Sequence, residues 1–215
     1  GATLICVTAF VGYEYQTATI SEEIQKPTPV SGAIKQFSSN VETGIYINNF
    51  PTLSFYKNNF SADSTVWFKF PIGTESLETI EQFSFKNGRI LHKSKPIITQ
   101  DNGNVIARYQ VTFDLKTHLK YEKFPFSGHR MHIIMENRTV SPRELTFNSE
   151  DENLRFSDKI LTENWKPKNT HVNSGYISST IDDDNPAMNV SYPAVIYSID
   201  FFNNSLRTII ALFLP

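Results

Sequence analysis

Alternation of polar and apolar side chains between Val105 and Leu115 limits what this chain can fold into more than any other feature. The apolar side chains recur at every second position: Val105, Ala107, Tyr109, Val111 and Phe113. Between them stand Arg108, Gln110 and Thr112. Successive side chains of a β-strand point to opposite faces, so this pattern predicts a strand with one buried face. On such a strand we expect Arg108 to be exposed.

Six further runs have strand character, because each is short and rich in β-branched or aromatic residues. They are Thr43–Phe50, Ser61–Phe70, Thr79–Phe85, His129–Met135, Thr170–Thr180 and Ala194–Phe202. Two polar sequences, Asp101–Asn104 and Asn87–Gly88, predict hairpin turns, since Asn and Gly tolerate positive φ. No helical period is sustained before the apolar C-terminal stretch. We therefore predict an all-β fold, an antiparallel immunoglobulin-like β-sandwich of about ten strands.

The chain is expected to have three parts. Residues 1–40 comprise an apolar stretch and a polar linker, residues 41–204 the sandwich, and residues 205–215 the start of a transmembrane helix. The apolar stretch, Ala2–Gly12, is shorter than the roughly 20 residues that span a bilayer. It is either the remnant of a signal peptide or membrane anchor, or a buried strand, since it is rich in β-branched residues.

Charge and composition exclude several classes of function. A formal net charge of −2 provides no basic field for a nucleic acid to follow. The single cysteine, Cys6, excludes an internal disulfide and a Cys-rich zinc site. The sequence has no nucleophile motif and no phosphate-binding glycine loop, so we predict no enzyme, no catalytic residues and no cofactor.

Two sequences contain metal-binding residue types, and neither leads us to predict a metal site. His129 and His132 are three residues apart, which puts them on opposite faces of a strand. The acidic run Asp182–Asp184 offers the carboxylate oxygens that Ca²⁺ prefers, but such runs are more often solvated loop tips.

Several segments, in the right order, resemble one family of receptors. The sequence KFPFSGHRMHI at Lys123–Ile133 resembles the YPFDxQxxxI segment of Cys-loop receptors, without the flanking cysteines, as in prokaryotic members. The segments NLRFSD at Asn153–Asp158 and TENW at Thr162–Trp165 are similar to segments that precede the ligand-capping loop in bacterial amine-gated channels. Upstream, Gly44–Asn49 and Phe60–Phe70 resemble the first two strands of the family. The resemblance covers about residues 41–215.

The resemblance implies the extracytoplasmic ligand-binding domain of a bacterial pentameric ligand-gated ion channel. Such a protein is a homopentamer of the bacterial inner membrane. This domain would then lie in the periplasm or the extracellular space, and a ligand at the subunit interfaces would gate a transmembrane pore.

The resemblance also implies a set of ligand-binding residues. A loop between Tyr176 and Tyr192 caps the ligand with aromatic side chains, and Glu136, Asn137 and Arg138 form the back wall of the pocket. The family usually has an aromatic residue where Arg138 stands, so we expect a small molecule that is an anion or a zwitterion, with an amine as the less favoured alternative.

The neighbouring subunit is expected to supply Trp67, Phe68 and Arg108. Trp67 and Phe68 are consecutive on a strand, so only one of them reaches the pocket and the other belongs to the core.

Two loops are expected to pass ligand binding to the membrane helices. One contains Lys57 and Asn58, and the other contains Phe124, Pro125 and Phe126. An alternative function is the periplasmic sensor domain of a membrane-anchored signalling protein built on the same β-sandwich. A hydrolase or lectin is disfavoured, since neither a catalytic carboxylate pair nor a metal-ligand spacing is present.

Overall fold

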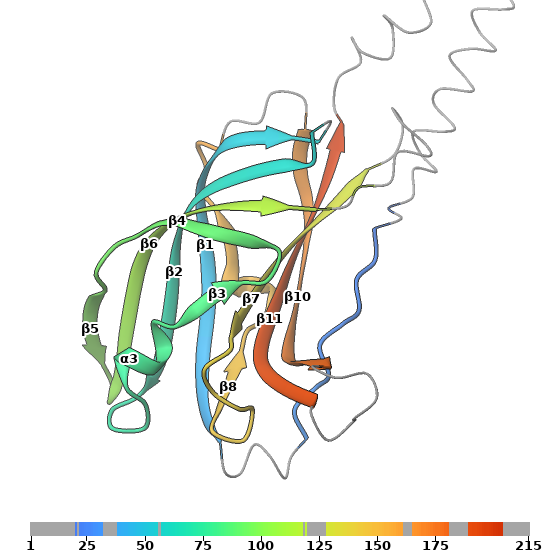
Figure 1. Cartoon of the computed structure of the whole chain (residues 1–215). Coiled ribbons are helices and arrows are strands. Elements are labelled where there is room, and N and C mark those ends of the chain that lie inside the picture. Colours follow the sequence, from blue (N-terminus) through green and yellow to red (C-terminus); the bar gives the residue numbers. More distant parts are fainter. Residues whose placement is uncertain are drawn as a thin grey trace, which may run out of the picture.

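The computed structural model describes residues 20, 22–31, 38–55, 57–117, 119, 128–160, 165–180 and 189–203. In these residues the fold is all-β and consists of two sheets, as predicted (Figure 1). Neither the predicted start of a transmembrane helix at residues 205–215 nor the apolar stretch at residues 2–12 is among them. No helix within the described ranges has the length and apolar character needed to cross a membrane.

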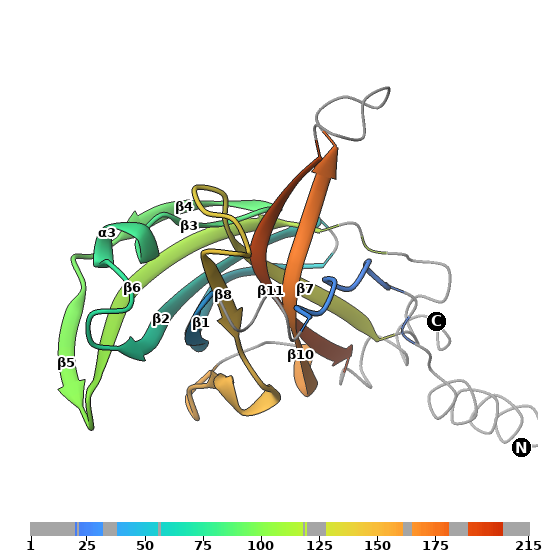
Figure 2. The ribbon, with the colours of Figure 1, turned by 90° about the horizontal axis from the view of Figure 1, so that it is seen from below.

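The first sheet has seven described strands, ordered β4-β6-β2-β1-β8, with β5 paired to β6 and β9 paired to β1. Their bounds are β1 (Ser39–Ser54), β2 (Asn59–Pro71), β4 (Gly88–Lys93), β5 (Ile97–Asp101), β6 (Asn104–Lys116), β8 (Leu145–Asn148) and β9 (Leu154–Phe156). The second sheet has four, ordered β10-β11-β7-β3. Their bounds are β3 (Phe83–Phe85), β7 (His129–Asn137), β10 (Trp165–Thr180) and β11 (Asn189–Asn203). Figure 2 shows β6, β2 and β1 side by side in one layer and β10 and β11 in the other.

The pairing departs from the predicted antiparallel arrangement at two short strands. Both β8 and β9 run parallel to β1, with Leu145 opposite Ser39 and Leu154 opposite Ile45. The reason is the path of the chain: after β7 it returns at the end of the molecule where β1 begins.

The core lies between the two sheets and is filled by alternate residues of the long strands. In β6 the odd-numbered residues from Ala107 to Leu115 are buried while Arg108 and Gln110 are exposed, which confirms the predicted alternation. Aromatic rings join the layers, since the ring centroids of Phe68 and Phe83 lie 5.2 Å apart. Each fully buried aromatic side chain contributes about 1.5–3 kcal/mol relative to exposure.

One predicted strand and one predicted hairpin turn are wrong. Residues Thr79–Phe85 do not form one strand, because Thr79 and Ile80 belong to the short helix α3 (Leu77–Ile80). The Ser76 hydroxyl caps this helix by accepting from the Thr79 N–H at 3.1 Å. Asn87–Gly88 does not close a hairpin, since it carries the chain from β3 in one sheet to β4 in the other. The turn at Asn102–Gly103 is as predicted, with φ of 47° and 77°.

Residues 22–31, which we call the strap, run along the four-stranded sheet on the side away from the other sheet (Figure 1). The sequence pattern assigns them to a linker, because they are polar and without period. Instead, Glu22 is buried and Thr28 forms a two-hydrogen-bond bridge with Tyr176 of β10. The strap therefore covers part of the outer face of that sheet.

Candidate functional site

Polar side chains cross the outer face of the four-stranded sheet in two rows. In one row His132 of β7, Ser198 of β11 and His171 of β10 are directly paired. In the next row Arg130 of β7 is paired with Asp200 of β11. Residues paired across antiparallel strands project from the same face, so the strand register alone brings these groups together.

Arg130 and Asp200 form a bidentate ion pair. The Nε atom of Arg130 donates to Oδ1 of Asp200 at 2.6 Å and Nη2 donates to Oδ2 at 3.0 Å. The Asp200 side chain is only 2% exposed, and its hydrogen bond raises the pKa of Arg130 above the ordinary value. The two bonds use two of the five N–H donors of the guanidinium and leave three for other partners.

Glu22 fastens the first end of the strap to β7. Its Oε1 atom lies 2.7 Å from Nδ1 of His129, and its Oε2 accepts from the Arg130 backbone N–H at 3.3 Å. As predicted, His129 and His132 use opposite faces of the strand: the His129 ring stacks on Phe55 in the core, with 5.6 Å between centroids.

His132 contacts both the strap and the outer face of the four-stranded sheet. Burial, followed by the nearby Arg130 charge, lowers the pKa of His132, so the ring is neutral at pH 7. Its Nε2 lies 3.4 Å from the Glu22 carbonyl oxygen and its Nδ1 lies 2.9 Å from the Ser198 hydroxyl. A neutral ring that donates from Nε2 to the carbonyl accepts at Nδ1, so the Ser198 hydroxyl donates to it.

The second end of the strap is held at β10. Thr28 donates to the Tyr176 carbonyl at 2.9 Å, and Tyr176 donates back to the Thr28 carbonyl at 3.0 Å. Any side chain at Gly175 would overlap the Thr28 carbonyl oxygen. A glycine inside a strand is therefore required here for close approach of another backbone.

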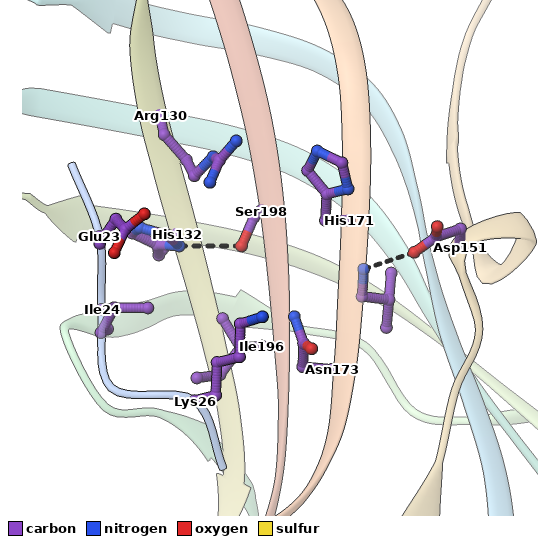
Figure 3. Close-up of a pocket in the computed structure, with 11 residues that line it drawn as sticks. Glu23, Ile24, Lys26, Arg130, His132, Asp151, His171, Asn173, Ile196 and Ser198 are labelled. Atoms are coloured by element: carbon purple, nitrogen blue, oxygen red, sulfur yellow. Dashed lines mark hydrogen bonds between the residues drawn. The ribbon is translucent and has the colours of Figure 1, made fainter. Parts of the chain in front are cut away.

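A pocket of about 540 Å³ lies between the strap and the sheet (Figure 3). We call it the strap pocket. The strap contributes Glu23, Ile24 and Lys26, the sheet contributes Arg130, His132, His171, Val172, Asn173, Ile196 and Ser198, and the short helix η1 (Asp151–Asn153) contributes Asp151. Among the described residues, no group of three His, Cys, Asp or Glu side chains is placed to hold a metal ion.

Three of the residues expected from the sequence meet at one end of this sheet, in what we call the hairpin corner: Glu136, Arg138 and Tyr192. The Nε of Arg138 lies 2.5 Å from Oε1 of the buried Glu136. The Arg138 guanidinium lies 5.9 Å from the Tyr192 ring centroid, within cation–π range. Arg138 itself is 57% exposed, which leaves it accessible to a ligand.

Two other expected residues do not join the hairpin corner. Asn137 is buried, where its amide donates to the Thr79 carbonyl at 2.7 Å and its Oδ1 accepts from the Thr139 N–H at 3.0 Å. Tyr176 is paired with Pro193, one position away from the pair that contains Tyr192, so the two tyrosines project from opposite faces of the hairpin.

The residues expected from the neighbouring subunit lie on the seven-stranded sheet. Phe68 is the core residue of its pair and is fully buried, so it cannot reach a ligand at the surface. Trp67 points outward, against Gly44, and is paired with the exposed Arg108. Trp67 and Arg108 thus lie on the seven-stranded sheet, whereas the hairpin corner lies on the four-stranded sheet.

The expected coupling loops are described only in part. Lys57 is exposed, and Asn58 has a positive φ of 51° in the turn between β1 and β2. Residues 124–126, like the acidic run at residues 182–184, lie outside the described residues.

The strap pocket is not among the sites expected from the sequence. Two local signals point to it: Ser198 and Asp200 occupy the outward positions of an otherwise apolar strand, and Gly175 interrupts another strand. Two polar side chains on the outward face of a strand indicate a covered or functional surface only when the segment that covers them is known. Here that segment is the strap.

Comparison with known proteins gives no match: no protein-family model fits the sequence, and no curated protein matches it at a significant level. The function must therefore be inferred from the residues and their contacts.

Proposed function

We propose that this chain is the extracytoplasmic ligand-binding domain of a bacterial pentameric ligand-gated ion channel. In this proposal the two sheets form an immunoglobulin-like sandwich, and residues 205–215 begin the first transmembrane helix. The observation that carries the proposal is the hairpin corner, where Arg138 and Tyr192 meet beside buried Glu136 at one end of the last hairpin. This is where the resemblance puts a ligand.

The chemistry of the corner favours a ligand with a carboxylate. Glu136 holds Nε of Arg138, so the outer edge of the guanidinium faces the surface with its remaining donors. A planar guanidinium binds a carboxylate through two parallel hydrogen bonds. A simple amine would be repelled by Arg138 and would compete with it for the face of Tyr192, which supports an anionic or zwitterionic ligand.

The second half of the site belongs to a neighbouring chain in this proposal. Trp67 and Arg108 lie on the outer face of the other sheet, and Arg108 adds a second exposed guanidinium. A closed head-to-tail ring brings one such face against the hairpin corner of the next copy. A homopentamer therefore completes each site with two different surfaces.

The path from ligand to membrane is the last hairpin. β10 and β11 are paired continuously from Thr180–Asn189 near the corner to Trp165–Asn203 at the other end, apart from one bulge. At that far end the Trp165 ring stacks on Phe55, which precedes the Lys57–Asn58 turn, with 4.3 Å between centroids. A shift of the hairpin would therefore reach the β1–β2 turn, one of the expected coupling loops.

The test uses the full-length protein in detergent and in planar bilayers. Native mass spectrometry is expected to give pentamers, and a panel of small amino acids and carboxylates is expected to include one that evokes current. Arg138→Gln should abolish that response, whereas Arg89→Gln, at an exposed position of β4, should leave it unchanged. Monomers or dimers alone would reject the channel.

One observation favours a second candidate, the periplasmic sensor domain of a membrane-anchored signalling protein. The strap packs directly on the sheet that forms the strap pocket, so a displacement of the sheet would be transmitted toward the N-terminus. The mass spectrum separates the two candidates, because a sensor of this kind would give dimers rather than pentamers.

A further inference from the structure

We propose that the strap pocket is a second binding site, contained within one chain, for a small zwitterionic molecule that carries the carboxylate and ammonium groups of an amino acid. The pocket volume of about 540 Å³ lies within the range of small-molecule sites, about 300–1,000 Å³. Its lining residues include none of those of the hairpin corner, and the site does not depend on the proposed channel.

The charges that line the pocket favour a zwitterion. Among the described lining residues four are acidic or basic, two of each kind: Glu23 and Asp151, and Lys26 and Arg130. Arg130 also shares its charge with buried Asp200. A strongly anionic ligand would meet these carboxylates and a simple cation would meet Lys26 and Arg130, whereas a zwitterion places each of its charges near an opposite one.

The donors suited to a carboxylate lie toward one end of the pocket. Figure 3 shows Arg130 and His171 at that end, on β7 and β10. The guanidinium of Arg130 has donors beyond the two that bind Asp200. Nε2 of His171 lies 3.7 Å from Oδ2 of Asp200, so both side chains lie beside the same carboxylate.

Acceptors suited to an ammonium lie beside these donors. The Ser198 hydroxyl donates a hydrogen bond to Nδ1 of His132, so its oxygen lone pairs are available to a donor from the pocket. In Figure 3, Glu23 of the strap is drawn at about the same height as His132 and Ser198. Ile24 and Ile196 add apolar surface for an aliphatic part of the ligand.

The strap holds its wall of the pocket in place before a ligand arrives. Glu22 and Thr28 are fixed by hydrogen bonds to β7 and β10, and Glu23, Ile24 and Lys26 lie between these two anchors. A wall fixed at both ends loses little further freedom on binding, which favours affinity.

The experiment measures binding of the full chain in detergent by calorimetry and thermal shift. The probes are the twenty common amino acids at 10 mM, each hit being compared with analogues that lack either the amine or the carboxylate; for leucine these are 4-methylpentanoate and 3-methylbutylamine. We expect at least one amino acid to bind, one molecule per chain, and both analogues to bind about tenfold more weakly or worse.

Variants at exposed wall positions keep the fold, so they test the site directly. Glu23→Gln should weaken binding by about tenfold, since it removes the carboxylate proposed to contact the ligand ammonium, and Lys26→Gln should weaken it less, since Lys26 attracts the ligand carboxylate without being one of its proposed contacts. The matched controls Glu78→Gln and Lys95→Gln, at exposed positions elsewhere, should bind like the wild type. Arg138→Gln, which disables the proposed interface site, should still bind one amino-acid molecule per chain, and the binding that remains belongs to the strap pocket.

Three results would overturn the proposal. They are the absence of binding by any of the amino acids, equal binding of the single-charge analogues, and wild-type affinity in both wall variants with circular dichroism showing that they are folded.

Discussion

The outer faces of the two sheets hold charges in opposite ways. On the seven-stranded sheet Lys69 and Glu42 form an ion pair 3.2 Å long in which both side chains are 40% exposed. On the four-stranded sheet Arg130 and Asp200 are paired in the same cross-strand manner, but the strap and the neighbouring side chains leave Asp200 only 2% exposed. The two ion pairs are therefore similar in their cross-strand geometry and differ in how far they are covered.

The extent to which each ion pair is covered decides how much it contributes to the stability of the fold. An exposed pair stabilises a fold by about 0–1 kcal/mol, because water screens its charges. Removing one partner of a buried pair costs about 3–5 kcal/mol, because the other charge remains buried without compensation. A chain keeps a buried ion pair where a specific arrangement of charges is needed. The strap-covered face is therefore the better place to look for function.

The largest expected effect is that of Asp200→Ala. It leaves Arg130 without its carboxylate on the covered face, and we expect the free energy of unfolding to fall by about 3–5 kcal/mol. Urea denaturation measures it. The matched variant Asp114→Ala breaks the exposed pair with Arg89 and should cost less than about 1 kcal/mol. Equal losses in the two variants would show that the cover makes no energetic difference.

A smaller effect is expected from Gly175→Ala, which tests the strap itself. The new methyl group would overlap the Thr28 carbonyl, so we expect a loss of about 1–3 kcal/mol or detachment of this end of the strap. Hydrogen exchange at the Tyr176 and Thr28 amides should become faster. Gly73→Ala is the control, since its added methyl meets open space and its cost, from a positive φ, leaves the strap amides protected.

The next effect is a pH dependence that comes from His132. Burial lowers its pKa in the folded chain, so below about pH 6.5 the unfolded chain binds more protons and the free energy of unfolding falls. His132→Gln should remove this part, at most about 1.4 kcal/mol per pH unit. Denaturation of both proteins between pH 5 and pH 7.5 measures the difference, and parallel pH profiles would contradict it.

The smallest effect is expected on the open face. A double-mutant cycle on Lys69 and Glu42 should give a coupling of about 0.2–1 kcal/mol, and added salt should reduce it. A coupling energy between Lys69 and Glu42 as large as that between Arg130 and Asp200 would mean that the outer face of the seven-stranded sheet is also covered, for example by another copy of the chain.

Local patterns in the sequence predicted the strands well and the covered site poorly. The alternation in β6 and the apolar run of β11 are properties of neighbouring residues. β6 lies where it was expected, whereas β11 begins at Asn189 rather than Ala194, inside the loop expected between Tyr176 and Tyr192. Residues 79–80 were misassigned because the Ser76 cap outweighed the β-propensity of the residues that follow.

The strap pocket was not predicted from the sequence, because the residues that contact one another around it are far apart in the chain. Glu22 and His129 are 107 residues apart, and Arg130 and Asp200 are 70 apart. No local period relates such residues, and a polar segment without period is indistinguishable from a linker until its partners are known. The hairpin corner was predicted in part, since Glu136 and Arg138 are close in sequence and the resemblance supplied Tyr192.

The bridge between Thr28 and Tyr176 also bears on solubility. β10 is the last strand in its sheet among the described residues and is 16 residues long, so its outer backbone groups could pair with a strand of another molecule. Thr28 occupies the groups of Tyr176, and Asp151 accepts from the Val172 N–H at 2.6 Å. By binding its own exposed edge at two points, the chain is protected against the strand-to-strand association that leads to aggregates.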